Sequence, residues 1–150
     1  VSLEGECRHI TSYLQIQQVR YQDILTYDVD IPEEIANCKI PKITLQPLVE
    51  NALYHGIKNK RGKGRIVVTG RREKDKCVIR VEDNGIGMTK ERLNQVRGGL
   101  TTKIEDSNDF YGLYNVNERI RLKFGEEYGL SIDSVLQEGT CVEVWLPWES

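Results

Sequence analysis

The sequence predicts an α+β fold, a two-layer α/β sandwich whose mixed, mostly antiparallel sheet carries helices on one face. Segments with period-two patterning come in pairs joined by short turns, as in antiparallel hairpins. Segments with helical spacing lie before and between these pairs, and strands paired in this way need a covering layer of helices. The hairpin strands are expected at 65–71, 77–82, 130–135 and 140–146, and the helices at 3–21, 43–59 and 112–124.

Size and composition are those of one globular domain. The chain has 150 residues, 39% hydrophobic and 29% charged, and a domain of this length buries roughly 68–70% of its unfolded surface. Its net charge of −2 comes from 21 basic and 23 acidic residues that are interspersed, which argues against nucleic acid or an anionic membrane as a partner. No apolar run approaches the ~20 residues that span a bilayer, and no signal peptide is visible, so we expect a soluble segment.

The sulfur-containing residues bear on compartment and completeness. Cys7, Cys38, Cys77 and Cys141 are far apart and form no C-x-x-C pair, so a zinc site is not indicated, and reduced core thiols in a cytosolic chain are expected. Met88 is the only methionine. Val1 is therefore not an initiator residue, and we expect a piece of a longer protein.

The first helix and the strand after it are read from spacing. Steps of four and three residues separate the members of one stripe, as in a helix that packs on another helix. Two interpretations stay open: a terminal helix folded onto its own domain, or a helix that continues upstream into a dimer bundle. Residues 24–31 alternate in character and end at Pro32, which predicts an edge strand. The stripe consists of Leu3, Cys7, Ile10, Leu14, Gln17 and Tyr21.

The second helix, 43–59, combines an apolar face with a polar one. Thr44 is a suitable cap and Pro47 is tolerable in the first turn. Its polar side is either a solvated face or a cluster that addresses one ligand. The apolar face comprises Leu45, Leu48, Val49, Ala52 and Leu53, and the polar side Glu50, Asn51, Tyr54, His55 and Lys58.

Between the two hairpins, residues 85–111 show no sustained periodicity and contain several glycines. A loop of this length inside a compact domain is usually a functional lid or a disordered segment. Gly112 then opens a helix. Leu113, Val116, Ile120 and Phe124 share one face of that helix, which predicts that it covers the sheet.

The run Asp83-Asn84-Gly85-Ile86-Gly87 is the first candidate site. It lies where a strand is expected to end, so the sheet would hold the carboxylate while the glycines let the backbone bend close to a ligand. A carboxylate in this position accepts a hydrogen bond from an exocyclic amine such as that of adenine. Taken alone, the run is equally typical of a tight turn.

Three further elements suggest a nucleotide. The amide oxygen of Asn51, beside Glu50, is a suitable ligand for Mg²⁺ held between protein and phosphates. Gly112 and Leu113 lie at an expected helix start, where free N–H groups and the positive dipole end favour phosphate. Thr140, after Gly139, places a hydroxyl where it can bind a base through water. Each element alone is common, and the order of all four carries the prediction.

In this order, the motifs LQPLVENALYHGI, VEDNGIGM and YGLYNVNERIRLKFG resemble the catalytic ATP-binding domain of bacterial sensor histidine kinases. That domain belongs to the GHKL ATPase superfamily, shared with type II topoisomerases, the heat-shock chaperone of ninety kilodaltons and mismatch-repair ATPases. The motifs cover about Leu45 to Phe124, and the Gly-Thr turn and the first helix extend the resemblance to nearly the whole chain. It implies the Bergerat-type ATP-binding fold with a long ATP lid.

The resemblance implies a role for each matching residue. Asn51 stands at the Mg²⁺ ligand and Asp83 at the adenine-binding aspartate, while Glu50 matches an acidic residue that orients or activates the attacking group. Phe110 stands where the family has the first glycine of G-x-G-L, so the path of the lid is not given by the likeness. The implied ATP-binding positions are Asn51, His55, Lys58, Asp83, Gly85, Gly87, Met88, Gly112, Leu113 and Thr140, with Glu50 catalytic.

By resemblance, residues 23–150 form a histidine kinase-like ATP-binding domain and 1–22 a linker helix from an upstream dimerisation hairpin. The parent would be a homodimeric two-component sensor kinase in the bacterial plasma membrane, with this domain in the cytoplasm. With ATP and Mg²⁺ it would phosphorylate a histidine outside this segment, for relay to a response regulator. The isolated domain is expected to be a monomer that binds ATP with little activity.

Two alternatives remain at the level of sequence. A chaperone- or topoisomerase-type ATPase would carry a glutamate base one helical turn before Asn51, where this chain has Pro47. A non-catalytic nucleotide-binding or interaction module would keep the fold and lose the reaction.

Overall fold

The structure, a computed structural model, describes residues 1–21, 24–57, 63–100 and 111–148. Five strands form one sheet in the order β1-β2-β3-β5-β4. The strand β1 runs parallel to β2, and every other neighbouring pair is antiparallel. β1 lies at an edge, as predicted. The strands are β1 (Leu25–Asp30), β2 (Gly64–Glu73), β3 (Lys76–Asp83), β4 (Gly129–Val135) and β5 (Gly139–Pro147).

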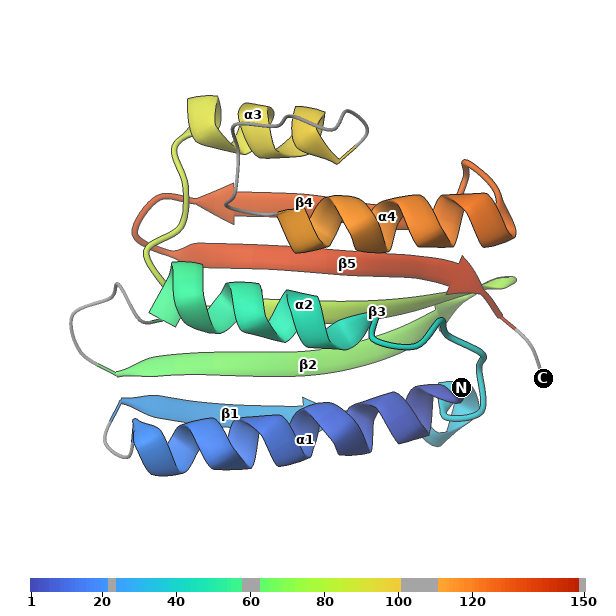
Figure 1. Cartoon of the computed structure of the whole chain (residues 1–150), viewed down its shortest axis with the longest axis horizontal. Coiled ribbons are helices and arrows are strands. Elements are labelled where there is room, and N and C mark those ends of the chain that lie inside the picture. The colour runs from blue at the N-terminus through green and yellow to red at the C-terminus, as the bar shows by residue number, and fades with distance from the viewer. Residues whose placement is uncertain (22–23, 58–62, 101–110, 149–150) are drawn as a thin grey trace.

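Helices α1, α2 and α4 lie along one face of this sheet, and α3 lies beside the β4 edge (Figure 1). The predicted two-layer α+β sandwich is confirmed. None of the described helices combines the length and apolar character that a membrane crossing requires. The helical elements are α1 (Leu3–Arg20), η1 (Glu33–Ile35), α2 (Leu45–Asn51), the π-helical η2 (Ala52–Ile57), α3 (Lys90–Gly99) and α4 (Tyr111–Phe124).

The core lies between the two layers and follows the two periodicities of the sequence. Along β3, Cys77, Ile79 and Val81 point to the helices and are at most 2% exposed, as period two requires. Along α1, the predicted stripe from Leu3 to Gln17 is buried against α2 and β1. The first helix therefore packs on its own domain, which is the first of the two interpretations.

Two local predictions are wrong, and a third needs correction in detail. Thr44 does not cap α2: its hydroxyl donates to the Pro41 carbonyl (2.6 Å). The helix predicted for 43–59 begins at Leu45 and changes from α-helix to the π-helical η2 at Ala52, and its predicted end at residue 59 lies outside the described residues. Finally, the interval 85–111 contains α3, which begins after Thr89, whose side chain accepts from the Arg92 N–H (3.1 Å).

The interval was misread for a physical reason. α3 buries only Leu93 and Val96 within its length and ends in two glycines, Gly98 and Gly99, which have low helix propensity. Its apolar stripe is thus too short to stand out as a period. The rest of the expected lid, residues 101–110 with Phe110, lies outside the described residues.

Candidate functional site

A cavity opens between α2 and α4 above the sheet, at the end where β3 finishes and β5 begins; we call it the α2–α4 cavity. Asp83 closes β3 and is paired in register with Thr140, the second residue of β5. The C-terminal end of α2 and the first turn of α4 complete the walls. The lining residues are Leu48, Asn51, Ala52, Val81, Asp83, Gly87, Met88, Leu113, Ile132, Thr140 and Val142.

Asp83 lies at the floor of this cavity and is only 7% exposed. Because Val81 points inward, period two brings Asp83 to the same face. Its Oδ1 accepts a hydrogen bond from the Gly85 N–H at 2.8 Å, so the carboxylate is held by its own loop. The next residue, Asn84, accepts from the Arg65 N–H through Oδ1 at 2.7 Å, which fixes the loop to the start of β2. The carboxylate is thus presented from a rigid frame.

Two glycines bring the neighbouring loops together beside Asp83. Gly87 (φ +66°) and Gly139 (φ +127°) both adopt backbone conformations that favour glycine. A Cβ on Gly87 would overlap the carbonyl of Val135, and one on Gly139 would overlap the carbonyl of Asp83. The Gln137 N–H also donates to the Ile86 carbonyl at 2.6 Å. The loop after β3 and the β4–β5 turn therefore form one packed unit.

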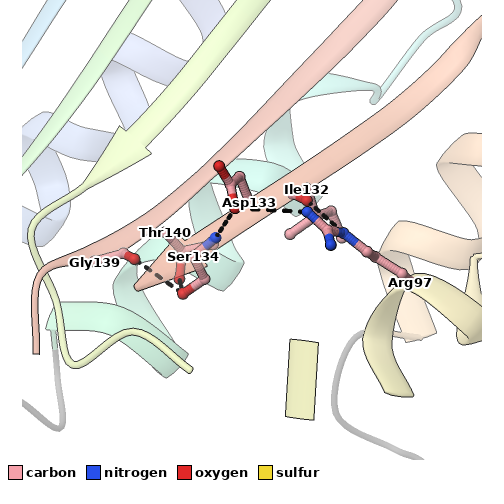
Figure 2. A network of polar contacts seen from close by, with 6 residues as sticks. All are labelled: Arg97, Ile132, Asp133, Ser134, Gly139 and Thr140. Atoms are coloured by element: carbon pink, nitrogen blue, oxygen red, sulfur yellow. Dashed lines mark hydrogen bonds and ion pairs between the residues drawn. The ribbon is translucent and has the colours of Figure 1, made fainter. Parts of the chain in front are cut away.

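Thr140 is held by a polar network on β4 and β5 (Figure 2). Ser134 Oγ lies 2.8 Å from Thr140 Oγ1 and donates to the Gly139 carbonyl at 2.9 Å. From α3, Arg97 Nε donates to the Ile132 carbonyl at 2.9 Å and its Nη2 lies 3.5 Å from Asp133 Oδ1. Because Asp133 Oδ1 also accepts from the Ser134 N–H (2.9 Å), α3 is tied to the strand that supports Thr140.

On the helix side, Asn51 is the last residue of α2 and half-buried, and it lines the cavity. The change from α-helix to π-helix occurs directly after it, at Ala52. Such π-helical turns are frequent at functional sites. Glu50, also half-buried, accepts a hydrogen bond from Gln46 Nε2 at 3.1 Å and does not line the cavity.

The first turn of α4 faces α2. Leu113, fully buried, lines the cavity. Gly112 is the second residue of α4, not its first as predicted, and a Cβ there would lie 3.3 Å from the Cβ of Pro47. A glycine at this position allows α4 to approach α2 closely.

The structure therefore brings six of the predicted nucleotide residues to one cavity. Gly85 and Gly112 lie next to it without lining it. The side chain of His55, on η2, and the whole of Lys58 lie outside the described residues. The six that line the cavity are Asn51, Asp83, Gly87, Met88, Leu113 and Thr140.

The sequence interpretation missed the apolar part of the cavity. Val81 and Val142 are two residues from Asp83 and Thr140 on the same strand faces, a signal that period two supplies. Apolar side chains on a buried face look like ordinary core, so the sequence alone does not separate them. The missed lining residues are Leu48, Ala52, Val81, Ile132 and Val142.

Asn117 was also missed. It is 4% exposed on α4, where its Nδ2 donates to the Leu100 carbonyl and its Oδ1 accepts from the Leu130 N–H, both at 2.9 Å. It thereby joins α3, α4 and β4. Its signal was present, since an asparagine four residues after Leu113 lies on the apolar face of α4.

Comparison with known proteins bears on what this site does. Residues 41–150 match the family described as Histidine kinase-, DNA gyrase B-, and HSP90-like ATPase. The chain belongs to this family.

Curated relatives specify the type. The chain is 32% identical over 148 residues to the sensor histidine kinase BtsS of Escherichia coli and 36% identical over 148 residues to the sensor histidine kinase YesM of Bacillus subtilis. It is 35% identical over 150 residues to the sensor protein LytS of Staphylococcus saprophyticus. These alignments cover 98–100% of this chain and only 24–25% of the relatives. The chain therefore corresponds to about a quarter of each relative.

Solved structures agree on the fold. The catalytic domain of the histidine kinase ThkA superposes with a TM-score of 0.71 at 10% identity, covering 99% of this chain and 93% of that one. The mycobacterial sensor histidine kinase MprB superposes with a TM-score of 0.64 at 18% identity, covering 99% and 96%. The family match and the curated relatives, taken together, identify the chain as an ATP-binding catalytic domain of the sensor histidine kinase type.

Proposed function

We propose that the α2–α4 cavity binds ATP with its adenine against Asp83. The observation that carries this proposal is one buried carboxylate at the floor of a mostly apolar cavity, which Asn51 and Thr140 also line. An adenine ring buries its faces against apolar side chains such as Val81 and Met88, and its exocyclic amine donates to the carboxylate. Thr140, already held by Ser134, supplies a second polar group at the base.

The donor set on α2 fits Mg²⁺ carried by the triphosphate. Within the described residues no cluster of three His, Cys, Asp or Glu side chains is placed to hold a metal ion, so a cage made only of protein is not indicated there. Mg²⁺ usually keeps several waters and takes one or two protein oxygens beside substrate phosphates. Asn51 would supply that oxygen, and the ion would neutralise charge on the phosphates. The first turn of α4, at Gly112 and Leu113, would approach the same phosphates.

The reaction follows from the family and rests on the parent protein. The γ-phosphoryl group of ATP passes to an imidazole nitrogen of a histidine upstream of this chain, so the bond from the γ-phosphorus to the bridging oxygen breaks, an N–P bond forms, and ADP and a proton leave. An aspartate of a response regulator then receives the phosphoryl group. Glu50, beside the cavity, would orient the acceptor. The domain would work in the cytoplasm, within a homodimeric parent at the plasma membrane.

The adenine assignment is tested with Asp83→Asn. The amide replaces one acceptor oxygen with a donor that faces the adenine amine, and a hydrogen bond to a charged group contributes roughly 1.5–3 kcal/mol. We expect ATP affinity by calorimetry to fall about 10- to 100-fold. Asp75→Asn, in the β2–β3 turn away from the cavity, is the matched control. Equal affinity of Asp83→Asn and the parent would remove the assignment.

The kinase assignment needs the parent protein. With ATP and Mg²⁺ it should become phosphorylated in an acid-labile form, and Asn51→Ala should abolish this by removing the metal ligand. Absence of acid-labile phosphate in a parent that binds ATP would refute the proposal. Steady hydrolysis of ATP by the isolated domain would instead favour an ATPase, although Pro47 occupies the position of the base such an enzyme would need.

A further inference from the structure

The turn before α2 is gripped from two sides. Residues Pro41–Thr44, which we call the 41–44 turn, connect the chain after η1 to the start of the helix that ends in Asn51. From α1, Glu6 Oε1 accepts from the Ile43 N–H at 2.6 Å and its Oε2 accepts from the Leu45 N–H at 3.1 Å. From α4, Arg119 donates to the carbonyls of Lys42 and Ile43, each at 2.7 Å.

The grip holds an unfavourable backbone conformation. Ile43 has φ +57°, which a β-branched residue rarely adopts, and the residue is 56% exposed, so burial does not stabilise this conformation. Conformations of this kind persist where surrounding contacts determine them. Here the two partners take both polar groups of Ile43, its N–H by Glu6 and its carbonyl by Arg119.

The burial of Glu6 on α1 is explained by its hydrogen bonds to the chain at the start of α2. It is 6% exposed, and burial of a carboxylate is unfavourable unless its oxygens are hydrogen-bonded. Its two bonds also replace the cap that Thr44 does not provide, because Leu45 is the first residue of α2 and its N–H lacks a partner within the helix. The orientation of α2 is therefore set from α1.

We propose that Glu6 and Arg119 are positioning residues of the nucleotide site. They act through their hydrogen bonds to the 41–44 turn, which fix the position of α2. Glu6 ties α2 to α1, and Arg119 ties it to α4, the helix whose first turn lines the cavity through Leu113. The two grips thus set the distance between Asn51 on one wall and Leu113 on the other. A displacement of α1 would therefore be transmitted through the Glu6 side chain to α2 and to Asn51, the proposed Mg²⁺ ligand.

This inference rests on the proposed nucleotide site, and it predicts a selective loss. Asp83 lies on β3, outside the gripped elements, so binding of the adenine should survive when the grip is weakened. Asn51 lies on α2, so the Mg²⁺-dependent part of the affinity should fall. Residues that orient metal ligands typically change metal affinity by roughly 10- to 100-fold.

The experiment compares ATP affinity with Mg²⁺ and with EDTA, for Glu6→Gln and for Arg119→Met. In each variant, the factor by which Mg²⁺ increases ATP affinity should fall roughly tenfold. ATP affinity in EDTA should stay within twofold of that of the unsubstituted domain. Amide hydrogen exchange across 45–51 should speed up in both variants. Arg119→Lys, which can still donate, should be intermediate. Glu4→Gln and Arg8→Met, at exposed positions of α1, are the controls and should match the parent.

Each outcome separates the two proposals. Failure of the unsubstituted domain to bind ATP refutes the proposed function. The exchange measurement would still show whether Glu6 and Arg119 stabilise α2. The positioning role would be overturned if Mg²⁺ increased the ATP affinity of the unsubstituted domain and of both variants by the same factor. Equal losses with Mg²⁺ and EDTA, which indicate general damage, would overturn it too. If Glu6→Gln does not fold, the exposed Arg119 carries the test. The double variant should lose less than the product of the single losses, because both residues hold one turn.

Discussion

The two ends of β3 use the same strand face differently. At one end Cys77 and Ile79 are fully buried beneath the helices, and the Cys77 thiol is close to those of Cys38 and Cys7. At the other end Val81 and Asp83 line the α2–α4 cavity. Burial, and then the nearby Cys38, raises the pKa of the Cys77 thiol above its ordinary range, so that end stays neutral, whereas the cavity end presents a carboxylate.

The difference shows how one period-two pattern serves both stability and binding. Cys7 of α1 and Cys38 lie close to Cys77, whereas Asp83 lines the α2–α4 cavity. The backbone at the cavity end is correspondingly special, with Gly87 and Gly139 at positive φ. Substitutions at the core end should therefore cost stability alone, and those at the cavity end should cost affinity as well.

Ile79→Ala should have the largest effect on stability. Ile79 is 0% exposed, and truncation of a buried isoleucine to alanine costs about 2–5 kcal/mol through lost burial and the cavity left behind. We expect urea unfolding to show about 4 kcal/mol of destabilisation, with ATP affinity of the folded fraction unchanged. Ile79→Val should cost about 1 kcal/mol. A large change in the ATP affinity of the folded protein would contradict the view that the core end of β3 contributes to stability alone.

Gly139→Ala should be next and should affect both quantities. Alanine at φ +127° is strained, and its Cβ would overlap the Asp83 carbonyl, so we expect about 3 kcal/mol of destabilisation. ATP affinity should fall at least tenfold, since the Asp83 loop must move. Gly98→Ala on α3 is the control: no heavy atom lies within 4 Å of its added Cβ, and alanine should stabilise by about 0.5 kcal/mol. Unchanged ATP affinity in Gly139→Ala would show that the loop tolerates displacement.

How much of the structure could be predicted from the sequence depends on how far apart along the chain the interacting residues lie. Local signals located the strands, the helix faces and the Asp83 run, because period and turn chemistry lie within a few residues. Glu6 was not identified, since its partners Ile43 and Leu45 are 37 and 39 residues away and nothing near Glu6 marks it as buried for a purpose. Thr44 was misread for the same reason, because a cap from another helix replaced the local one.

The cavity wall was missed for a different reason. Val81 and Val142 differ from core residues only in what faces them, and that depends on where α2 and α4 part. The change from α-helix to π-helix at Ala52 is likewise not marked in the sequence, since Ala52 and Leu53 continue the apolar pattern without a break. Patterns along one chain do not contain this information.

Alkaline pH should weaken the core end and leave the cavity end unaffected. Burial, and then the nearby Glu6, raises the pKa of the Cys7 thiol from 9.0 to about 11. A thiol with a raised folded pKa contributes stability that is complete below pH 9.0 and is lost as pH rises through about 11. We expect the Cys7 thiol to contribute about 2 kcal/mol to the fall in the free energy of unfolding across this window. Cys7→Ala should have a shallower slope, and an equal slope would assign the loss to other groups.

Ser134→Ala should have the smallest effect and gives the sharpest test of the cavity end. Ser134 does not line the cavity, yet its Oγ holds both the Gly139 carbonyl and Thr140 Oγ1. Loss of a hydrogen bond of this kind costs about 1 kcal/mol, so we expect ATP affinity to fall about fivefold. Ser134→Thr keeps the hydroxyl and should restore most of the affinity, while Ser131→Ala, exposed on the same strand, should leave it unchanged. Equal affinity in Ser134→Ala and the parent would mean that Thr140 needs no support or does not touch the base. Thr140→Val separates these, because only a threonine that contacts the nucleotide weakens binding when its hydroxyl is removed.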